Sequence, residues 1–249
     1  MTPNVVGIVC ALQSEARHLG AATRRTDSLS ALSDGTLLLV AGMGSEAAAL
    51  GARALVDAGA TALVSWGMAG GLDPSLASGT LVLPSEIMAP DGRVLETSQP
   101  WRERLSAAVC SQLPAVHGKL VTSARSVGSV ADKTALFRAT GAAAVDMESL
   151  AVAQVAVSQQ LPFLAVRVIV DAAGDVLPGA VTAAADSAGH LRVWRLLGAV
   201  ALSDLPALVR LARCYRAASR SLAAVAAAGS LAPYAFPLAL GHTSRTTVS

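Results

Sequence analysis

The sequence predicts an α/β fold in which helices cover both faces of a central, largely parallel sheet. Short runs of apolar and β-branched residues, bounded by Gly, Pro or polar residues, are typical of buried strands. Alanine-rich stretches of helical length lie between several of these runs. Because strands and helices alternate along the chain, we expect parallel strands joined by helical crossovers.

Each element follows from a local pattern. Strands are expected at residues 5–10, 36–41, 62–66, 80–83, 119–122 and 163–170. Helices are expected at residues 45–58, 102–112, 130–140 and 148–159. Gly59 and Pro162 come just after two of these helical stretches, where such residues end a helix before the next strand. The chain of 249 residues fits one large domain better than two small ones.

The strand pattern ends near residue 186, and helical stretches follow at residues 190–202 and 205–228. At about 100° per residue, the arginines of the second stretch fall within an arc of about 120°. These are Arg210, Arg213, Arg216 and Arg220, and Leu208, Leu211, Tyr215, Leu222 and Val225 lie opposite them. We therefore divide the chain into a domain at residues 1–203 and an amphipathic helix with an apolar tail at residues 204–249.

The arginine face has two interpretations. It is the solvated side of a helix packed on the domain, or it docks with the apolar tail on anionic lipid headgroups. Gly229, Pro233 and Pro237 interrupt the uncharged stretch at residues 221–244, so no membrane-spanning helix is expected. Residues 1–7 lack the pattern of a secretory signal, so we expect a cytoplasmic protein, peripheral to the inner membrane face if the arginines bind lipid.

Composition excludes several functional classes. The 19 Lys and Arg residues nearly balance the 17 Asp and Glu residues, and only 3% of residues are aromatic. We therefore expect no nucleic-acid partner, which would need a basic surface with stacking aromatics. A 53% hydrophobic content excludes a disordered chain. Cys10, Cys110 and Cys214 show neither CxxC spacing nor a nearby His cluster, so they predict reduced core thiols and no metal site.

Ligands of open α/β sheets bind beyond the carboxyl ends of the strands. The segments there that carry acidic residues or glycines are residues 11–15, 42–44, 67–71, 145–148 and 170–175. Gly42, Gly44 and Ala47 have the spacing of a dinucleotide-binding turn, but the next strand ends in Trp66-Gly67 and lacks the acidic residue that would bind ribose. A tight turn from strand to helix explains these glycines equally well.

The acidic residues at the strand ends are candidates for chemistry. In Asp146-Met147-Glu148, a carboxylate at a helix N-terminus could accept hydrogen bonds from two sugar hydroxyls while the Met147 thioether packs on the ring. An N-cap Asp with a Glu in the first turn is the ordinary explanation. Asp171 follows a buried strand, where burial favours a general acid, or backbone amides satisfy it as a loop residue. Glu15 could activate water or be only a charge in the first turn of a helix.

The segments that carry a family resemblance are GIVCALQSEA, AGMGSEAAALGARAL, WGMAGGLDPSLASGTLVLPSE, AVDMES and FLAVRVIVDAAGD. In this order, over residues 5–175, they resemble the nucleoside phosphorylase and nucleosidase superfamily, nearest in outline to methylthioadenosine/S-adenosylhomocysteine nucleosidases. AVDMES with an arginine-rich C-terminal helix is similar to the hopanoid-associated branch, whose implied substrate is adenosylhopane. The resemblance implies a single domain with a twisted, mixed, mostly parallel sheet and a C-terminal helical extension.

The resemblance also implies roles for individual residues. Glu15 would activate water, Met147 and Glu148 would bind ribose, and Asp171 would donate a proton to the purine N7. Breaking an N-glycosidic bond builds positive charge on the ribose and negative charge on the base, and these groups stabilise both. The other residues expected to bind substrate are Met43, Gly44, Met68, Ala69, Gly70 and Val127, the last in the base-binding loop at residues 123–128.

Water is favoured over phosphate as the attacking group. In related phosphorylases an Arg and a Ser at the matching strand bind phosphate, whereas Ser65 and Met68 stand there in this chain. Residues 11–15 also lack the GDPxR-like motif of those enzymes. Phosphorolysis of the same bond is the alternative, with phosphate as a co-substrate, and no other cofactor is expected.

The substrate is expected to carry an apolar 5′ group. Met43, Met68 and Leu12 predict an apolar pocket wall, although ordinary core packing explains methionines equally well. We therefore expect release of adenine from adenosylhopane to give ribosylhopane, with methylthioadenosine or S-adenosylhomocysteine as alternative substrates. A nucleoside-binding protein without catalysis is a further alternative, which the joint presence of all three acidic residues disfavours. Relatives imply a homodimer or a larger homo-oligomer.

Overall fold

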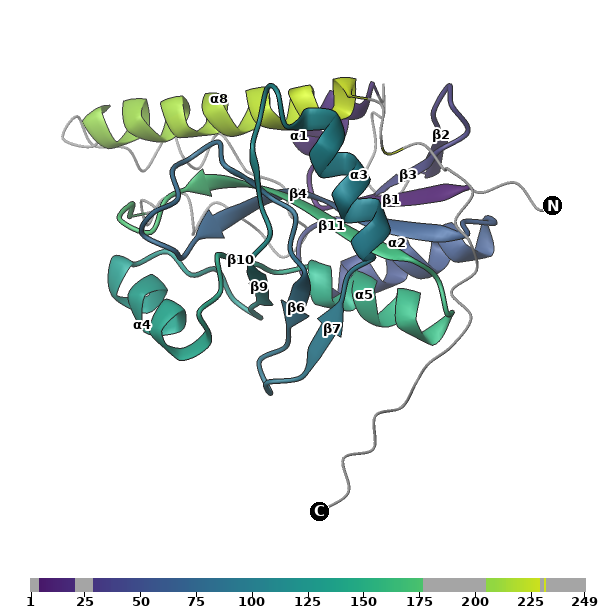
Figure 1. Ribbon diagram of the computed structural model, residues 1–249, viewed down its shortest axis with the longest axis horizontal. Helices are drawn as coiled ribbons and strands as arrows, with labels where there is room; N and C mark the ends of the chain where they lie inside the picture. The colour runs from purple at the N-terminus through teal and green to yellow at the C-terminus, as the bar shows by residue number, and fades with distance from the viewer. Residues whose placement is uncertain (1–4, 21–28, 177–204, 229–230, 232–249) are drawn as a thin grey trace, which may run out of the picture.

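The computed structural model of the chain describes residues 5–20, 29–176, 205–228 and 231. In this part of the chain, one mixed sheet of eleven strands has helices on both faces (Figure 1). The strands are β1 (Val6–Cys10), β2 (Leu29–Ala31), β3 (Leu37–Val40), β4 (Ala62–Gly71), β5 (Leu81–Val82), β6 (Glu86–Met88), β7 (Val94–Glu96), β8 (Ala115–Val116), β9 (Lys119–Thr122), β10 (Ala144–Asp146) and β11 (Phe163–Asp171). The helices are α1 (Gln13–Ala16), η1 (Arg17–Leu19), α2 (Ser45–Asp57), α3 (Gln99–Val109), α4 (Val130–Thr140), α5 (Ser149–Ser158) and α8 (Leu205–Ala227). The predicted α/β domain with a mixed sheet is confirmed.

The long strand β4 is the centre of the sheet. It pairs in parallel with β1 on one side and with β11 on the other. At its carboxyl end it also pairs antiparallel with β10, which continues the sheet through β9, β6 and β7. Gly70 of β4 therefore has Val145 of β10 and Asp171 of β11 as strand partners. Three segments far apart in the sequence meet at this one point.

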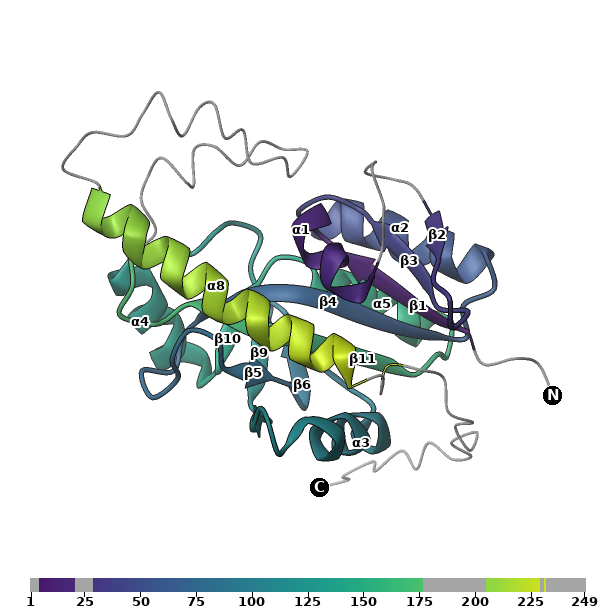
Figure 2. The same cartoon turned by 90° about the horizontal axis from the view of Figure 1, so that it is seen from above.

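Alternating side chains of the sheet divide the core into two layers. On β1, Ile8 belongs to an apolar cluster that includes side chains of α3 and α8, whereas Val9 belongs to a cluster with α2 and α5. Figure 2 shows α8 in front of the sheet, along β11, and α2 and α5 behind the sheet. Burial of both sheet faces explains why the strands read as nearly continuous apolar runs.

Helix α8 packs on the domain through its carboxyl-terminal half. Ala218, Leu222 and Val225 are fully buried in the same cluster as the sheet residues of β11, and Ser221 donates a hydrogen bond to the carbonyl of Gly79. Tyr215, expected on the apolar side, is 39% exposed. No helix in the described residues is long and apolar enough to cross a membrane. The helix expected at residues 190–202 and the apolar tail beyond residue 231 lie outside the described residues.

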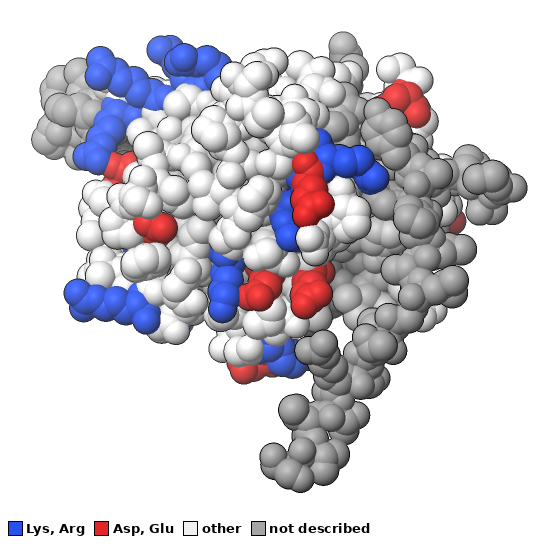
Figure 3. All heavy atoms as spheres, viewed as in Figure 1, with Lys and Arg blue, Asp and Glu red and all other residues white. Residues whose placement is uncertain are grey.

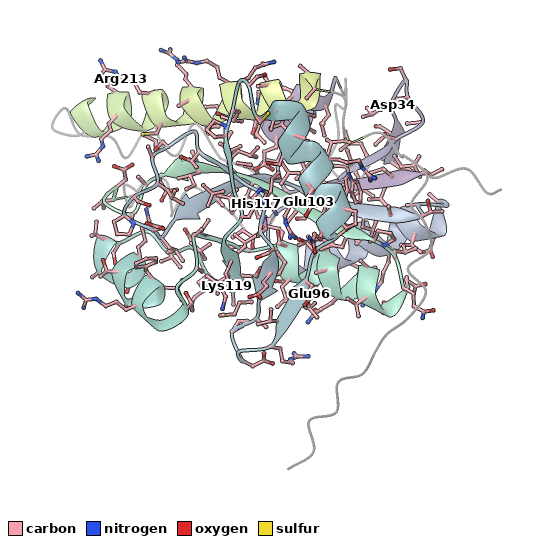
Figure 4. All side chains as sticks on the ribbon, viewed as in Figure 1. Asp34, Glu96, Glu103, His117, Lys119 and Arg213 are labelled. Atoms are coloured by element: carbon pink, nitrogen blue, oxygen red, sulfur yellow. The ribbon has the colours of Figure 1, made fainter. Side chains whose placement is uncertain are left out.

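The arginines of α8 lie on its outer side. All four (Arg210, Arg213, Arg216 and Arg220) are exposed, and basic side chains gather over α8 at the upper left of the face seen in Figure 3. Arg213 points away from the sheet (Figure 4). Arg210 differs from the others because its guanidinium pairs with the carboxylate of Asp175, just beyond β11. One of the four arginines therefore forms an ion pair with the loop that follows β11.

The structure differs from the sequence prediction mainly at short strands. β2, β6, β7, β8 and β10 each have only two or three residues, which is too few for a hydrophobic period to be recognised. β4 was expected to end at residue 66 but continues to Gly71. Glycines weaken a strand, but here they are needed, because neighbouring atoms lie so close that a Cβ at Gly67 would collide with them and one at Gly71 would be crowded.

Candidate active site

Glu15 of α1 lies against Gly67 of β4. Its buried carboxylate accepts hydrogen bonds from the backbone N–H groups of Leu12 (to Oε2, 3.0 Å) and Met68 (to Oε1, 2.9 Å). Gly67 is required here, since a Cβ at this position would lie 2.6 Å from Oε1 of Glu15. Trp66 Nε1 donates to the backbone carbonyl of Glu15 over 3.2 Å. Burial raises the pKa of Glu15, and the hydrogen bond from Met68 opposes that rise.

Glu148 precedes α5 and faces the turn between β3 and α2. The backbone N–H of Gly44 donates to its Oε1 over 2.8 Å, and that of Met147 donates to its Oε2 over 3.3 Å. Gly44 has a φ of +95°, which favours glycine, so the turn itself accounts for this residue of the GxG pattern. Burial, followed by the nearby Asp146 carboxylate, raises the pKa of Glu148 to about 7, and the Arg167 guanidinium opposes this rise.

Asp171 ends β11 beside Gly70 of β4. Its Oδ2 would lie 3.5 Å from a Cβ on Gly70, and it accepts a hydrogen bond from the ammonium Nζ of Lys133 over 2.5 Å. Burial raises the pKa of Asp171 to about 6. The hydrogen bond and the positive charge of the Lys133 ammonium oppose this rise, because they favour the ionised carboxylate. A carboxyl group with this pKa can donate a proton near neutral pH.

A buried ion pair underlies the site. Arg167, in the middle of β11, donates to Asp146 Oδ2 through Nε over 2.9 Å, and its Nη2 lies 2.8 Å from the same oxygen as an ion pair. Nη2 also donates to the hydroxyl of Ser65 over 2.6 Å. Asp146 further accepts hydrogen bonds from the Thr122 hydroxyl (2.7 Å) and from the backbone N–H of Ser149 (3.0 Å). Asp146 therefore caps the start of α5, while its charge is compensated by a single arginine.

The three acidic side chains flank the carboxyl end of β4. A Cβ added at Gly67 would meet the Glu15 carboxylate, and one added at Gly70 would meet that of Asp171. Glu148 lies just after β10, which pairs with β4 at Gly70 and Gly71. This cluster combines a carboxylate held by two amides, a second carboxylate beside a glycine turn and an acid that can donate a proton. Such a set can withdraw a proton from one reactant and deliver a proton to another.

The other predicted binding residues surround this cluster with different exposures. Met43, Met68, Met147 and Val127 are half-buried. Met68 packs against the apolar cluster on the α8 face, and Val127 packs against a small cluster that contains Val145. The methyl group of Ala69 is buried among core side chains on the opposite face, so this residue offers the site only its backbone. In the described residues no group of three or more metal-ligating side chains occurs.

Sequence reasoning missed Lys133 and Arg167. Lys133 lies in a stretch that has the pattern of an ordinary surface helix, yet its side chain is 0% exposed. Arg167 did leave a signal, because it is a charged residue inside the apolar run at residues 163–170. A charge buried in a strand needs a partner, and that requirement points to a second acidic residue nearby.

Comparison with known proteins identifies the family. Residues 6–197 match the sequence profile described as Phosphorylase superfamily, which covers more than half of the chain. The chain belongs to the phosphorylase superfamily. Among curated relatives, the 5′-methylthioadenosine/S-adenosylhomocysteine nucleosidases of Mycobacterium bovis and Mycobacterium tuberculosis are each 27% identical to this superfamily member, over 83% of its length and 96% of theirs.

Solved structures have the same fold as this superfamily member. The 5′-methylthioadenosine/S-adenosylhomocysteine nucleosidase of Helicobacter pylori superposes with a TM-score of 0.66 at 16% identity, over 93% of this chain and 98% of the other. That of Colwellia psychrerythraea, in complex with adenine, gives 0.65 at 20% identity, over 92% and 96%. Futalosine hydrolase of Helicobacter pylori gives 0.63 at 16% identity, over 89% and 97%.

Proposed function

We propose that this protein is a nucleosidase that uses water to cleave the N-glycosidic bond of an adenosine-bearing lipid, adenosylhopane, releasing adenine and ribosylhopane. The observation that carries the proposal is the placement of Glu15, Glu148 and Asp171 along the carboxyl end of β4. Membership of the phosphorylase superfamily supports the reaction class, and the curated relatives are named nucleosidases.

Each acidic residue has a distinct part in the proposed reaction. Asp171 donates its proton to N7 of the departing adenine, whose negative charge is thereby neutralised. Glu148 accepts hydrogen bonds from ribose hydroxyls and stabilises the positive charge that builds on the sugar. Glu15 accepts a proton from the attacking water, whose oxygen forms the new bond to the anomeric carbon. The atoms balance, since water supplies the hydroxyl of the product and the proton taken up by Glu15.

Attack by water is favoured over attack by phosphate because the buried cation near the site is already engaged. The guanidinium of Arg167 donates to Asp146, to the Ser65 hydroxyl and to the carbonyl of Val166. The Ser65 hydroxyl also accepts from that of Ser149 over 3.2 Å. A phosphate dianion needs several free donors, and here these groups bind one another.

The substrate proposal rests on the apolar side chains beside the cluster. Leu12, Met43 and Met68 are half-buried and flank the segments that hold Glu15 and Glu148. Methionine and leucine can pack on a hydrocarbon attached to the ribose 5′ carbon. A second candidate, hydrolysis of methylthioadenosine or S-adenosylhomocysteine, is favoured by the 27% identical relatives, which are named for that activity.

Free adenine, measured by chromatography, tests the proposed reaction. Purified protein receives adenosylhopane in detergent, with methylthioadenosine as a small control substrate, in phosphate-free buffer and with phosphate added. We expect equal release with and without phosphate, and faster release from adenosylhopane. Release that requires phosphate would overturn hydrolysis, and release from methylthioadenosine alone would overturn the lipid substrate. Glu15→Gln, which keeps the shape of the side chain but accepts no proton, is the inactive control.

A lipid substrate requires access to a bilayer, and we propose that the outer arginines of α8 provide it. Arg213, Arg216 and Arg220 are exposed on α8, and Arg213 points away from the sheet (Figure 4). Arginines on one side of a helix attract anionic headgroups, with a contribution of about 1 kcal/mol for each charge near the surface. The same face would place the domain at the membrane from which the lipid is taken.

Vesicle co-sedimentation tests this membrane contact. The double variant R213E/R216E is expected to bind phosphatidylglycerol vesicles at least about 10-fold more weakly than the unchanged protein. The matched control R53E/R138E makes the same change in charge at exposed positions on α2 and α4, and it should bind as the unchanged protein does. Equal binding by both double variants would show that α8 is only a packing element. Phosphatidylcholine vesicles should retain none of the proteins.

A further inference from the structure

Lys133 is the most deeply buried charged side chain at the edge of the cluster. It lies in the first turns of α4, after the cap formed by the Ser129 hydroxyl and the backbone N–H of Asp132. Its ammonium donates to Asp171 Oδ2 (2.5 Å) and to the carbonyls of Ala172 (2.8 Å) and Asp175 (3.0 Å). An ammonium group has three donors, and all three are used within the protein. Lys133 therefore has no donor left for a substrate.

These three bonds fix the acid and the loop behind it together. Asp171 ends β11, and the chain then turns so that Asp175 Oδ2 accepts from the backbone N–H of Ala172 over 2.9 Å. Arg210 of α8 pairs with the other carboxylate oxygen of Asp175. Lys133 thus links α4 to the end of β11 and to the following loop, which Arg210 of α8 also contacts. Without the Lys133 side chain, the Asp171 carboxyl would lose the hydrogen bond that fixes its orientation.

The position of the ammonium also distinguishes the two oxygens of Asp171. A protonated carboxyl places its hydrogen on one oxygen only, and its carbonyl oxygen is the better hydrogen-bond acceptor. Because the ammonium donates to Oδ2, the proton of the acid is favoured on Oδ1. The charged groups that act on Asp171 are the Lys133 ammonium from α4 and the Asp175 carboxylate from the following loop, while β4 presents the uncharged Gly70 and Gly71.

We propose that Lys133 is a positioning residue for Asp171: its ammonium holds Oδ2 in place, so that Oδ1 delivers the proton. The charge of Lys133 also sets the pH range in which Asp171 keeps that proton. This inference rests on the proposed nucleosidase function. It assigns Lys133 no contact with the substrate. A purely structural ion pair would also stabilise the fold, but it would not control the pH dependence of the reaction.

The pH profile of adenine release tests this inference. Lys133→Met keeps the length of the side chain but removes its charge, so kcat should fall by about 10²-fold through misorientation of the acid. The decline of the rate on the alkaline side should move up by about one pH unit or more, because an opposite charge no longer favours the ionised form of Asp171. A uniform loss of rate with an unmoved decline would overturn the proposal.

Two further variants keep the test decisive if Lys133→Met does not fold. Lys133→Gln is also neutral, and it should show the same upward displacement of the alkaline decline, since its amide can still donate to the loop carbonyls. Lys133→Arg retains the charge, so its decline should stay at the pH of the unchanged protein while kcat falls at constant KM. A raised KM with unchanged kcat in this variant would overturn the positioning role. Absence of adenine release by the unchanged protein would instead refute the proposed function.

Discussion

Asp171→Asn is expected to slow adenine release by about 10²-fold to 10⁴-fold, because the amide keeps the shape of the carboxyl group but has no acidic proton to donate. Burial raises the pKa of Asp171 to about 6 in the free protein, so its proton is present below that pH and is lost above it. The kcat/KM of the unchanged protein should therefore decline as the pH rises through about 6. The residual activity of the variant should lack this decline.

Asp57→Asn is the matched control for this change. Asp57 is exposed at the end of α2, so the same replacement there should leave adenine release within about twofold of the unchanged protein. Thermal unfolding of both variants separates a loss of chemistry from a loss of folded protein. Near-normal turnover by a folded Asp171→Asn protein would remove Asp171 from the reaction.

Gly67→Ala is expected to lower kcat by about 10²-fold, a loss that a displacement of about 1 Å at a catalytic group can cause. The added Cβ would lie 2.6 Å from Oε1, 2.8 Å from Cδ and 2.9 Å from Oε2 of Glu15. These distances are shorter than any normal contact, so the carboxylate must move away from the backbone N–H of Met68. The charge of the site stays the same, and only its placement changes.

Ser111→Ala serves as the control for this second prediction. Ser111 is exposed just after α3 and belongs to none of the segments that hold the acidic residues, so alanine there should leave kcat unchanged within about twofold. Assays of adenine release at saturating substrate compare the two alanine variants directly. Unchanged kcat in a folded Gly67→Ala protein would show that Glu15 does not act from the position seen in the structure.

The sequence predicted the elements that carry enough residues for a clear pattern. The strands β1 and β11 and the helices α2 and α4 begin and end within a few residues of the expected positions. The central feature, the junction of β4 with β10, was not predictable. It depends on antiparallel pairing of Gly70 with Val145, and a pattern of side chains along one segment contains no information about its distant partner.

Glu15 and Asp171 of the candidate site were noticeable in the sequence because each follows a strand that is apolar enough to be recognised, whereas Glu148 was noticeable only as the start of a helical stretch. All three flank the carboxyl end of β4, Glu15 beside Gly67, Asp171 beside Gly70 and Glu148 just after β10. Lys133 was not predictable, since its helix α4 has the composition of a solvated surface and only tertiary packing buries the side chain. The acidic residues share one edge of the sheet because β10 and β11 both pair with β4 near Gly70, and no local sequence pattern predicts that pairing.

The buried pair of Asp146 and Arg167 affects how activity screens of this protein must be interpreted. Replacing one member leaves the other as an uncompensated buried charge, which typically costs about 3–5 kcal/mol, a large share of the stability of a domain. Single-residue scanning scored on total activity in extracts would therefore rank Asp146 and Arg167 beside Glu148. The lost activity would reflect missing protein rather than missing chemistry. To separate the structural pair from the reactive groups, both partners must be replaced together and activity expressed per molecule of folded protein.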